Sequence, residues 1–151
     1  MIQKMHADSK RSILFKKYSQ HQLEKAHIRL EEAISQLSRL RDSIKELQMQ
    51  IDTLFDKVNR YINQPKLEIR TVASTNALII HKQQQKLELE QLAEETELKI
   101  KQLSKEFRQV KAEDDFVNEL QITHSQKIQR YKDAQMDKSS LEIHVARRER
   151  K

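Results

Sequence analysis

Apolar residues recur every seven positions between residues 23 and 61, in two interleaved sets three residues apart. One set is Leu23, Leu30, Leu37, Ile44, Ile51 and Val58, and the other is Ala26, Ala33, Leu40, Leu47, Leu54 and Tyr61. We call these twelve positions the first stripe. Such spacing predicts an α-helix with one narrow apolar face. Because a helix cannot bury that face alone, the pattern also predicts a second helix packed against it.

The first stripe ends at a clear helix-breaking segment, Asn63-Gln64-Pro65. Proline lacks the amide hydrogen that a helix interior needs, and it disfavours the helical conformation of the residue before it. We therefore predict a first helix over about residues 8–62.

The segment after the proline mixes β-branched residues with charges, so its helix propensity is only moderate. We predict a bent connector over about residues 63–75. Ser74 or Thr75 is the expected N-cap of a second helix over about residues 76–147.

A second, weaker stripe lies where a chain folded back near residue 70 would place it, with positions 79–117 facing 61–23. The apolar members in that window are Ile79, Leu89, Ala93, Ile100, Leu103, Phe107, Val110 and Val117. The polar exceptions are Lys82, Lys86, Thr96 and Asp114, and the spacing continues through Gln121, His124, Ile128 and Tyr131. These sixteen positions are the second stripe.

Two stripes separated by a proline-containing break favour an antiparallel hairpin over a long parallel dimer. The predicted fold class is all-α, a long antiparallel two-helix coiled-coil hairpin that forms one elongated domain over residues 1–151. Dimerisation of such a hairpin stays open at this point.

Composition argues against catalysis. The chain has no glycine and no cysteine, which removes phosphate loops, nucleophile elbows, disulfides and cysteine zinc sites. Glu24 and His27 have the spacing of one half of a carboxylate-bridged metal site, but no second half exists. We expect His27 to be solvated or salt-bridged, and we interpret Asp114 and Asp115 as solubilising charge. No enzymatic activity, cofactor or metal is expected.

Basic residues gather near both ends of the chain, whose formal net charge is +6. Residues 1–25 hold six basic and two acidic side chains, and residues 126–151 hold eight and four. Since the ends of a hairpin meet, we predict a basic tip of about +8 that would suit an acidic partner. Lys16, Lys17, Arg147 and Arg148 are its candidate binding residues, although cations are also the usual solvated face of a coiled coil.

Two other partner classes are less favoured. The basic residues are not interleaved with aromatic ones and form no known nucleic-acid-binding motif, so we expect no specific nucleic-acid binding. No apolar run approaches the roughly 20 residues that span a bilayer, so we expect no membrane insertion and a cytoplasmic location.

The hairpin pattern, the glycine-free composition and the basic ends together resemble the stalk proteins of bacterial type III secretion systems. These are the FliJ family of the flagellum and its SctO (YscO) counterparts in injectisomes. Ile51-Asp52-Thr53-Leu54, a break, and then Ala77 to Gln85 are similar to the central region of injectisome members. Leu141 and Glu142 ahead of Arg147-Arg148 are similar to the family's C-terminal pattern, from which Ile143 and His144 depart.

This resemblance implies a function. Family members insert their terminal end into the pore of the hexameric secretion ATPase and reach the cytoplasmic domain of the export gate with the hairpin end. Ala77 and His81 match the spacing of an alanine and a histidine on the gate-binding surface, whereas Ser74 and Arg70 depart from the apolar residues expected beside them. His81 equally fits an ordinary exposed position. Secretion chaperones are further candidate partners, and the location implied is peripheral to the export apparatus.

Two alternative functions remain from sequence alone. A structural scaffold would use the same heptads in a parallel, self-associating coil. A binder of anionic surfaces or nucleic acid would use the same basic ends and would show a steep salt dependence.

Overall fold

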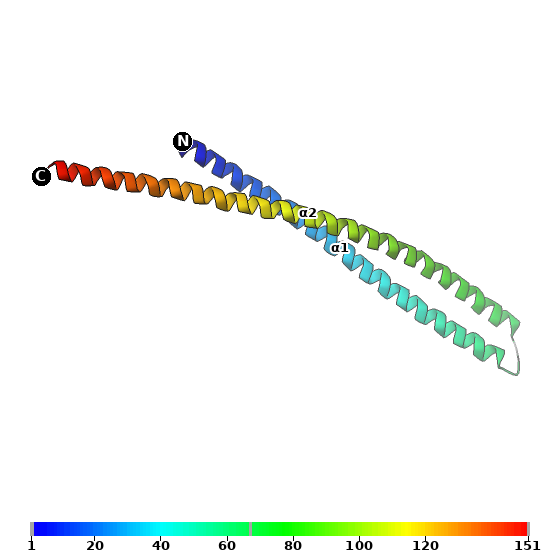
Figure 1. The fold of residues 1–151 in the computed structure, drawn as a ribbon. Helices are drawn as coiled ribbons and strands as arrows, with labels where there is room; N and C mark the ends of the chain where they lie inside the picture. Colours follow the sequence, from blue (N-terminus) through cyan, green and yellow to red (C-terminus); the bar gives the residue numbers. More distant parts are fainter. Residues whose placement is uncertain (1, 67, 151) are drawn as a thin grey trace. The chain divides into compact units, whose positions relative to one another are not determined.

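Two long helices make up nearly all of the computed structural model, which describes residues 2–66 and 68–150. Helix α1 spans Ile2–Ile62 and helix α2 spans Ile69–Glu149, and the chain reverses direction between them (Figure 1). No strand occurs among the described residues. The all-α two-helix hairpin predicted from the sequence is therefore confirmed.

The predicted helix boundaries were too narrow. Helix α1 begins at Ile2 rather than near residue 8, and α2 ends at Glu149 rather than near residue 147. Polar residues interrupt the heptad pattern before Leu23, and the second stripe ends at Tyr131, so the pattern could not mark where α1 begins or where α2 ends. Leu67, in the predicted connector, and Lys151, in the predicted basic tip, lie outside the described residues.

The helices contribute to two compact units, where one continuous domain had been predicted. The hairpin unit is residues 27–106, and the terminal unit combines residues 1–26 with 107–151. The units differ in their contact positions. Before Leu23 the first stripe continues along α1 through four polar residues, whereas within the hairpin unit it is entirely apolar. The four polar residues are Ser9, Ser12, Lys16 and Ser19.

Burial along both helices follows the two stripes. All twelve residues of the first stripe and all sixteen of the second are buried or half-buried. In the hairpin unit, Ile51, Leu54 and Val58 of α1 pack with Ile79 of α2, and the partly buried Val72 packs against them. Ile51, at 2% exposure, is the most enclosed of these side chains. Removing such aliphatic side chains from water is the main stabilising contribution to a structure of this kind.

The polar exceptions in the second stripe have hydrogen-bond partners, which explains why they are tolerated. Lys82 donates from Nζ to Oε1 of Gln50 across the helix pair at 2.7 Å, and Lys86 donates likewise to Gln48. Thr96, only 4% exposed, donates its hydroxyl to the carbonyl of Leu92 in its own helix. Buried polar groups cost little when they are paired in this way.

The connector is shorter than predicted, because α2 begins at Ile69 and residues 69–75 are helical. Ser74 and Thr75 do not cap the helix. Both lie inside its first turns and donate their hydroxyls to the carbonyl of Thr71. Glu68 occupies the helix start instead: its carbonyl accepts the amide of Val72, and its Oε2 accepts the hydroxyl of Thr71 at 2.8 Å. A carboxylate there is favoured by the helix dipole.

The shorter connector sets a different register from the one predicted. The sequence prediction placed residue 51 opposite residue 89, but Gln50 contacts Lys82 and Gln48 contacts Lys86. In the terminal unit Ser19 contacts Asp114, so the pairing is displaced by about one heptad from the prediction. A displacement of one heptad leaves the same residues at the interface. The two stripes were therefore predicted correctly although their register was wrong.

This register predicts which pair of introduced cysteines will join, in a chain that has none of its own. Ser19→Cys with Asp114→Cys should form a disulfide under mild oxidation, because these side chains touch across the helix pair. Ser19→Cys with Gln121→Cys represents the other register and should stay reduced, since one heptad is about 10 Å of helix. Non-reducing electrophoresis of monomer reads out both variants. Preferential oxidation of the second pair would contradict the register.

Candidate partner-binding surfaces

The whole net charge of the chain belongs to the terminal unit. Residues 1–26 and 107–151 together hold 16 basic and ten acidic residues, a net of +6, whereas residues 27–106 hold 13 of each. The hairpin unit is neutral overall. An acidic partner is therefore attracted to the terminal unit and gains no net attraction from the hairpin unit.

A buried polar contact lies at the centre of the terminal unit. The hydroxyl of Ser19 on α1 donates to Oδ1 of Asp114 on α2 at 2.9 Å, and the two residues are 9% and 7% exposed. Asn118 lies within 3.5 Å of the other carboxylate oxygen. The interpretation of Asp114 as solubilising charge was wrong, because its heptad position turns it toward α1. Asp115, the next residue, is exposed as expected.

The terminal unit has a paired part and an unpaired part. Ser19 lies opposite Asp114, and the two helices run antiparallel. Counting back along α1 from Ser19 and forward along α2 from Asp114 therefore places Tyr131 opposite Ile2, where α1 begins. Tyr131 is half-buried, and every residue from 132 to 150 is exposed. We call residues 132–149 the α2 extension. It runs beyond the N-terminal end of α1 (Figure 1), so no segment of α1 covers it.

The α2 extension corrects the predicted basic tip. Lys16 lies opposite Val117 in the observed register, some 30 residues before Arg147 along α2. At about 1.5 Å per residue these cations are separated by roughly 45 Å along the helix. The two ends of the chain do not meet, because α2 has 81 residues and α1 has 61. The predicted tip is thus two separate basic regions.

The four candidate cations differ in their surroundings. Lys16 is half-buried because it occupies a contact position, and Lys17 beside it is exposed. Arg147 and Arg148 are exposed in the last turn of α2, where cations complement the helix dipole. The two arginines are therefore the more accessible pair.

The candidate gate-binding residues lie on α2 in the hairpin unit, within its first four turns. Arg70, Ser74, Ala77 and His81 follow a spacing of four, three and four residues, and all four are exposed. Residues with this spacing share one face of a helix. Ala77 and His81 thus belong to a continuous accessible strip.

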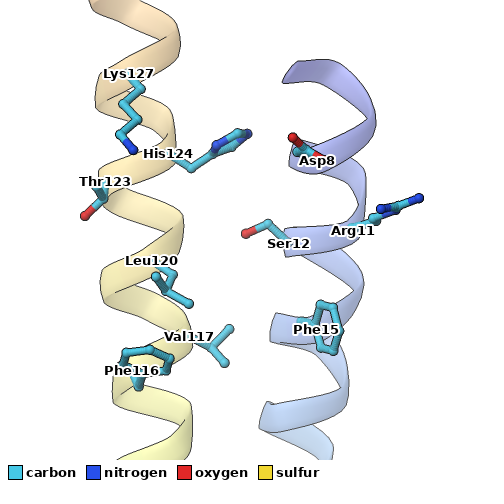
Figure 2. Close-up of a pocket in the computed structure, with 10 residues that line it drawn as sticks. All are labelled: Asp8, Arg11, Ser12, Phe15, Phe116, Val117, Leu120, Thr123, His124 and Lys127. Carbon is cyan, nitrogen blue, oxygen red and sulfur yellow. The ribbon is translucent and has the colours of Figure 1, made fainter. Parts of the chain in front are cut away.

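A groove in the terminal unit was not predicted. It has a volume of about 520 Å³ and lies between α1 and α2. Its lining residues are Asp8, Arg11, Ser12 and Phe15 from α1 and Phe116, Val117, Leu120, Thr123, His124 and Lys127 from α2 (Figure 2). Phe15, Phe116 and Leu120 are 65%, 60% and 52% exposed. The signal in the sequence that could have predicted this groove is a set of apolar residues beside the stripe positions, spaced three and four residues apart.

His27 lies beside Glu31 in an exposed position, with Nε2 at 3.0 Å from Oε1 of the carboxylate. Among residues 2–66 and 68–150, no three histidine or carboxylate side chains are grouped to hold a metal ion. Within the same residues neither helix contains a stretch apolar enough to cross a membrane.

Comparisons with known proteins add no family assignment. No protein-family model, curated protein or solved structure matches this chain. Its functional surfaces are therefore identified from burial, charge and packing.

The buried pair in the terminal unit predicts opposite effects for two substitutions. Ser19→Ala removes a hydrogen-bond donor from the buried carboxylate of Asp114 and should lower the stability of the terminal unit by about 1–3 kcal/mol. Ser19→Ala combined with Asp114→Leu replaces both polar groups with an apolar pair and should raise stability above that of the original chain. Hydrogen exchange of amides in residues 8–26 and 110–131 measures both effects. A neutral single variant or a destabilised double variant would show that the pair does not limit stability.

Proposed function

We propose that this protein is the non-enzymatic central stalk of a bacterial type III secretion system. It would couple the hexameric export ATPase to the cytoplasmic domain of the export gate and thereby assist protein secretion. The observation that carries this proposal is the combination of an antiparallel two-helix hairpin with a net charge confined to the unit that holds both termini. Secretion chaperones are further candidate partners.

The ATPase contact is assigned to the α2 extension. Its residues have no neighbour on α1, and Arg147 and Arg148 are exposed in its last turn. An uncovered helical end with cations suits an acidic central pore, because opposite charges steer association and fix orientation. Lys16 and Lys17 lie further along the paired part and take a secondary role in this assignment.

The gate contact is assigned to the strip of Arg70, Ser74, Ala77 and His81. It lies on α2 close to the connector, in the first turns of the helix, whereas the α2 extension is the last part of α2 in sequence. The small side chain of Ala77 permits close approach of a partner, and His81 supplies a ring that both packs and hydrogen-bonds. Ser74 and Arg70 make this strip more polar than the resemblance implies.

Coupling in this proposal is mechanical. Helix α1 runs without a break through residues contributed to both units, and so does α2. Backbone hydrogen bonds hold each helix at a fixed rise, and packing of the stripes holds the pair together. A force applied to the terminal unit then has two continuous helices along which to act.

Reversing the charge of the two arginines in the last turn of the α2 extension tests the ATPase contact. Arg147→Glu with Arg148→Glu should weaken binding to the purified export ATPase about tenfold or more and should flatten its salt dependence, because attraction becomes repulsion. Lys16→Glu with Lys17→Glu should have a smaller effect. Binding is measured by biolayer interferometry at several salt concentrations.

Lys99→Glu with Lys101→Glu is the matched control, since both residues are exposed on α2 in the neutral hairpin unit. It changes the net charge by the same amount and should leave binding nearly unaltered. Equal losses in the control and in the arginine variant would mean that overall charge, and not the α2 extension, determines binding.

A single substitution tests the gate contact. His81→Ala should weaken capture of the chain by the purified cytoplasmic domain of the export gate, while circular dichroism stays unchanged because His81 is exposed. Gln83→Ala, two residues later and on another face of α2, is the control and should bind normally. If both variants bind as the original chain does, the gate contact does not include His81.

A further inference from the structure

The groove of the terminal unit has regularly spaced lining residues on both helices and an apolar floor. Among the lining residues on α1, residues 8, 11 and 15 are three and four positions apart. On α2, residues 116, 120, 123 and 127 show the same spacing. Both sets keep the three- and four-residue spacing of a helical contact face. Two such faces on one side of a helix pair are the arrangement that receives a third helix in a bundle.

The groove has an apolar floor. Phe15, Phe116, Val117 and Leu120 lie toward one end of the groove (Figure 2), and three of them are more than half exposed in the isolated chain. Tyr18, three residues after Phe15, extends the apolar face along α1 and is 64% exposed. Aromatic and leucine side chains gathered in this way are typical of anchor sites for a protein partner.

The other end of the groove and its rim are polar and largely basic. Arg11 on α1 and Lys127 on α2 flank it, and Figure 2 shows His124 directed toward Asp8 between them. Over residues 4–18, α1 carries five cations and one carboxylate. A second copy of this chain would bring another terminal unit of net charge +6 against the first, which disfavours self-association.

We propose that this groove binds an amphipathic helix of another protein, with apolar residues on one face and acidic residues beside them. The apolar face would cover Phe15, Phe116 and Leu120, and the acidic residues would pair with Arg11 and Lys127. The result is a local three-helix bundle. This inference uses no property of an ATPase or an export gate, so its test is independent of the proposed stalk function.

A reporter placed in the groove tests the proposal directly. Thr123→Cys, labelled with an environment-sensitive fluorophore, gives one reporter because the chain has no cysteine of its own. The probe is an acidic peptide of three heptads, with leucine at the two core positions of each heptad and glutamate at the positions beside them. The matched control is a basic peptide with lysine in place of each glutamate. The acidic peptide should produce a saturable blue shift, and the basic peptide should bind at least about tenfold more weakly.

Variants of the chain locate the binding site. Phe15→Ala with Leu120→Ala should weaken binding of the acidic peptide about tenfold, because it removes the apolar floor. Phe55→Ala with Leu87→Ala is the matched control, since these two side chains are 45% and 49% exposed beside a groove in the neutral hairpin unit. The control should bind as the original chain does, and circular dichroism should show unchanged helicity in both variants.

Four results would overturn the proposal. They are the absence of a saturable shift with the acidic peptide, equal responses to both peptides, equal losses in the two double variants, and a shift that the labelled chain alone gives on concentration. The last result would assign the groove to a second copy of the chain. A shift produced by vesicles of phosphatidylglycerol, with none from the peptide, would assign it to an anionic membrane surface instead.

Discussion

Burial of a narrow apolar stripe between two antiparallel helices is the interaction on which this structure depends. Neither helix has another way to remove Ile51, Leu54 and Val58 from water, and Ile79 on α2 completes their cluster. The chain has too few aromatic residues for a second kind of core. Stability is therefore distributed along the helix pair, and it varies with the residues that occupy each successive heptad.

The two units differ in charge and in exposed apolar surface as well as in packing. The hairpin unit has an apolar first stripe and no net charge, which suits a structural element. The terminal unit replaces apolar contacts with Ser19 and Asp114, carries the whole net charge, and leaves Phe15 and its neighbours uncovered. A polar interior that is fully paired specifies a register without much stabilisation. The net charge and the uncovered aromatic residues of the groove are thus found in the unit whose interior contains a polar pair.

Heptad periodicity explains both what could be predicted from the sequence and what could not. It identified every residue of the two stripes, because contact positions depend only on spacing. It could not give the register, since a shift of one heptad presents the same positions, and the early start of α2 at Ile69 decided between them. The position of Glu68 at the start of α2 depends on a local hydrogen bond, and the groove around Phe15 depends on residues that flank the stripes. The stripe pattern includes neither.

The most direct test of intramolecular pairing is a distance between the two helices within one molecule. Spin labels at Ala33→Cys and Ile100→Cys, diluted with unlabelled chain, report that distance by pulsed electron paramagnetic resonance. The hairpin predicts a single short distance, since packed helix axes lie about 8–10 Å apart. A long separation that persists on dilution, approaching the roughly 100 Å of a continuous helix between these positions, would contradict the paired structure.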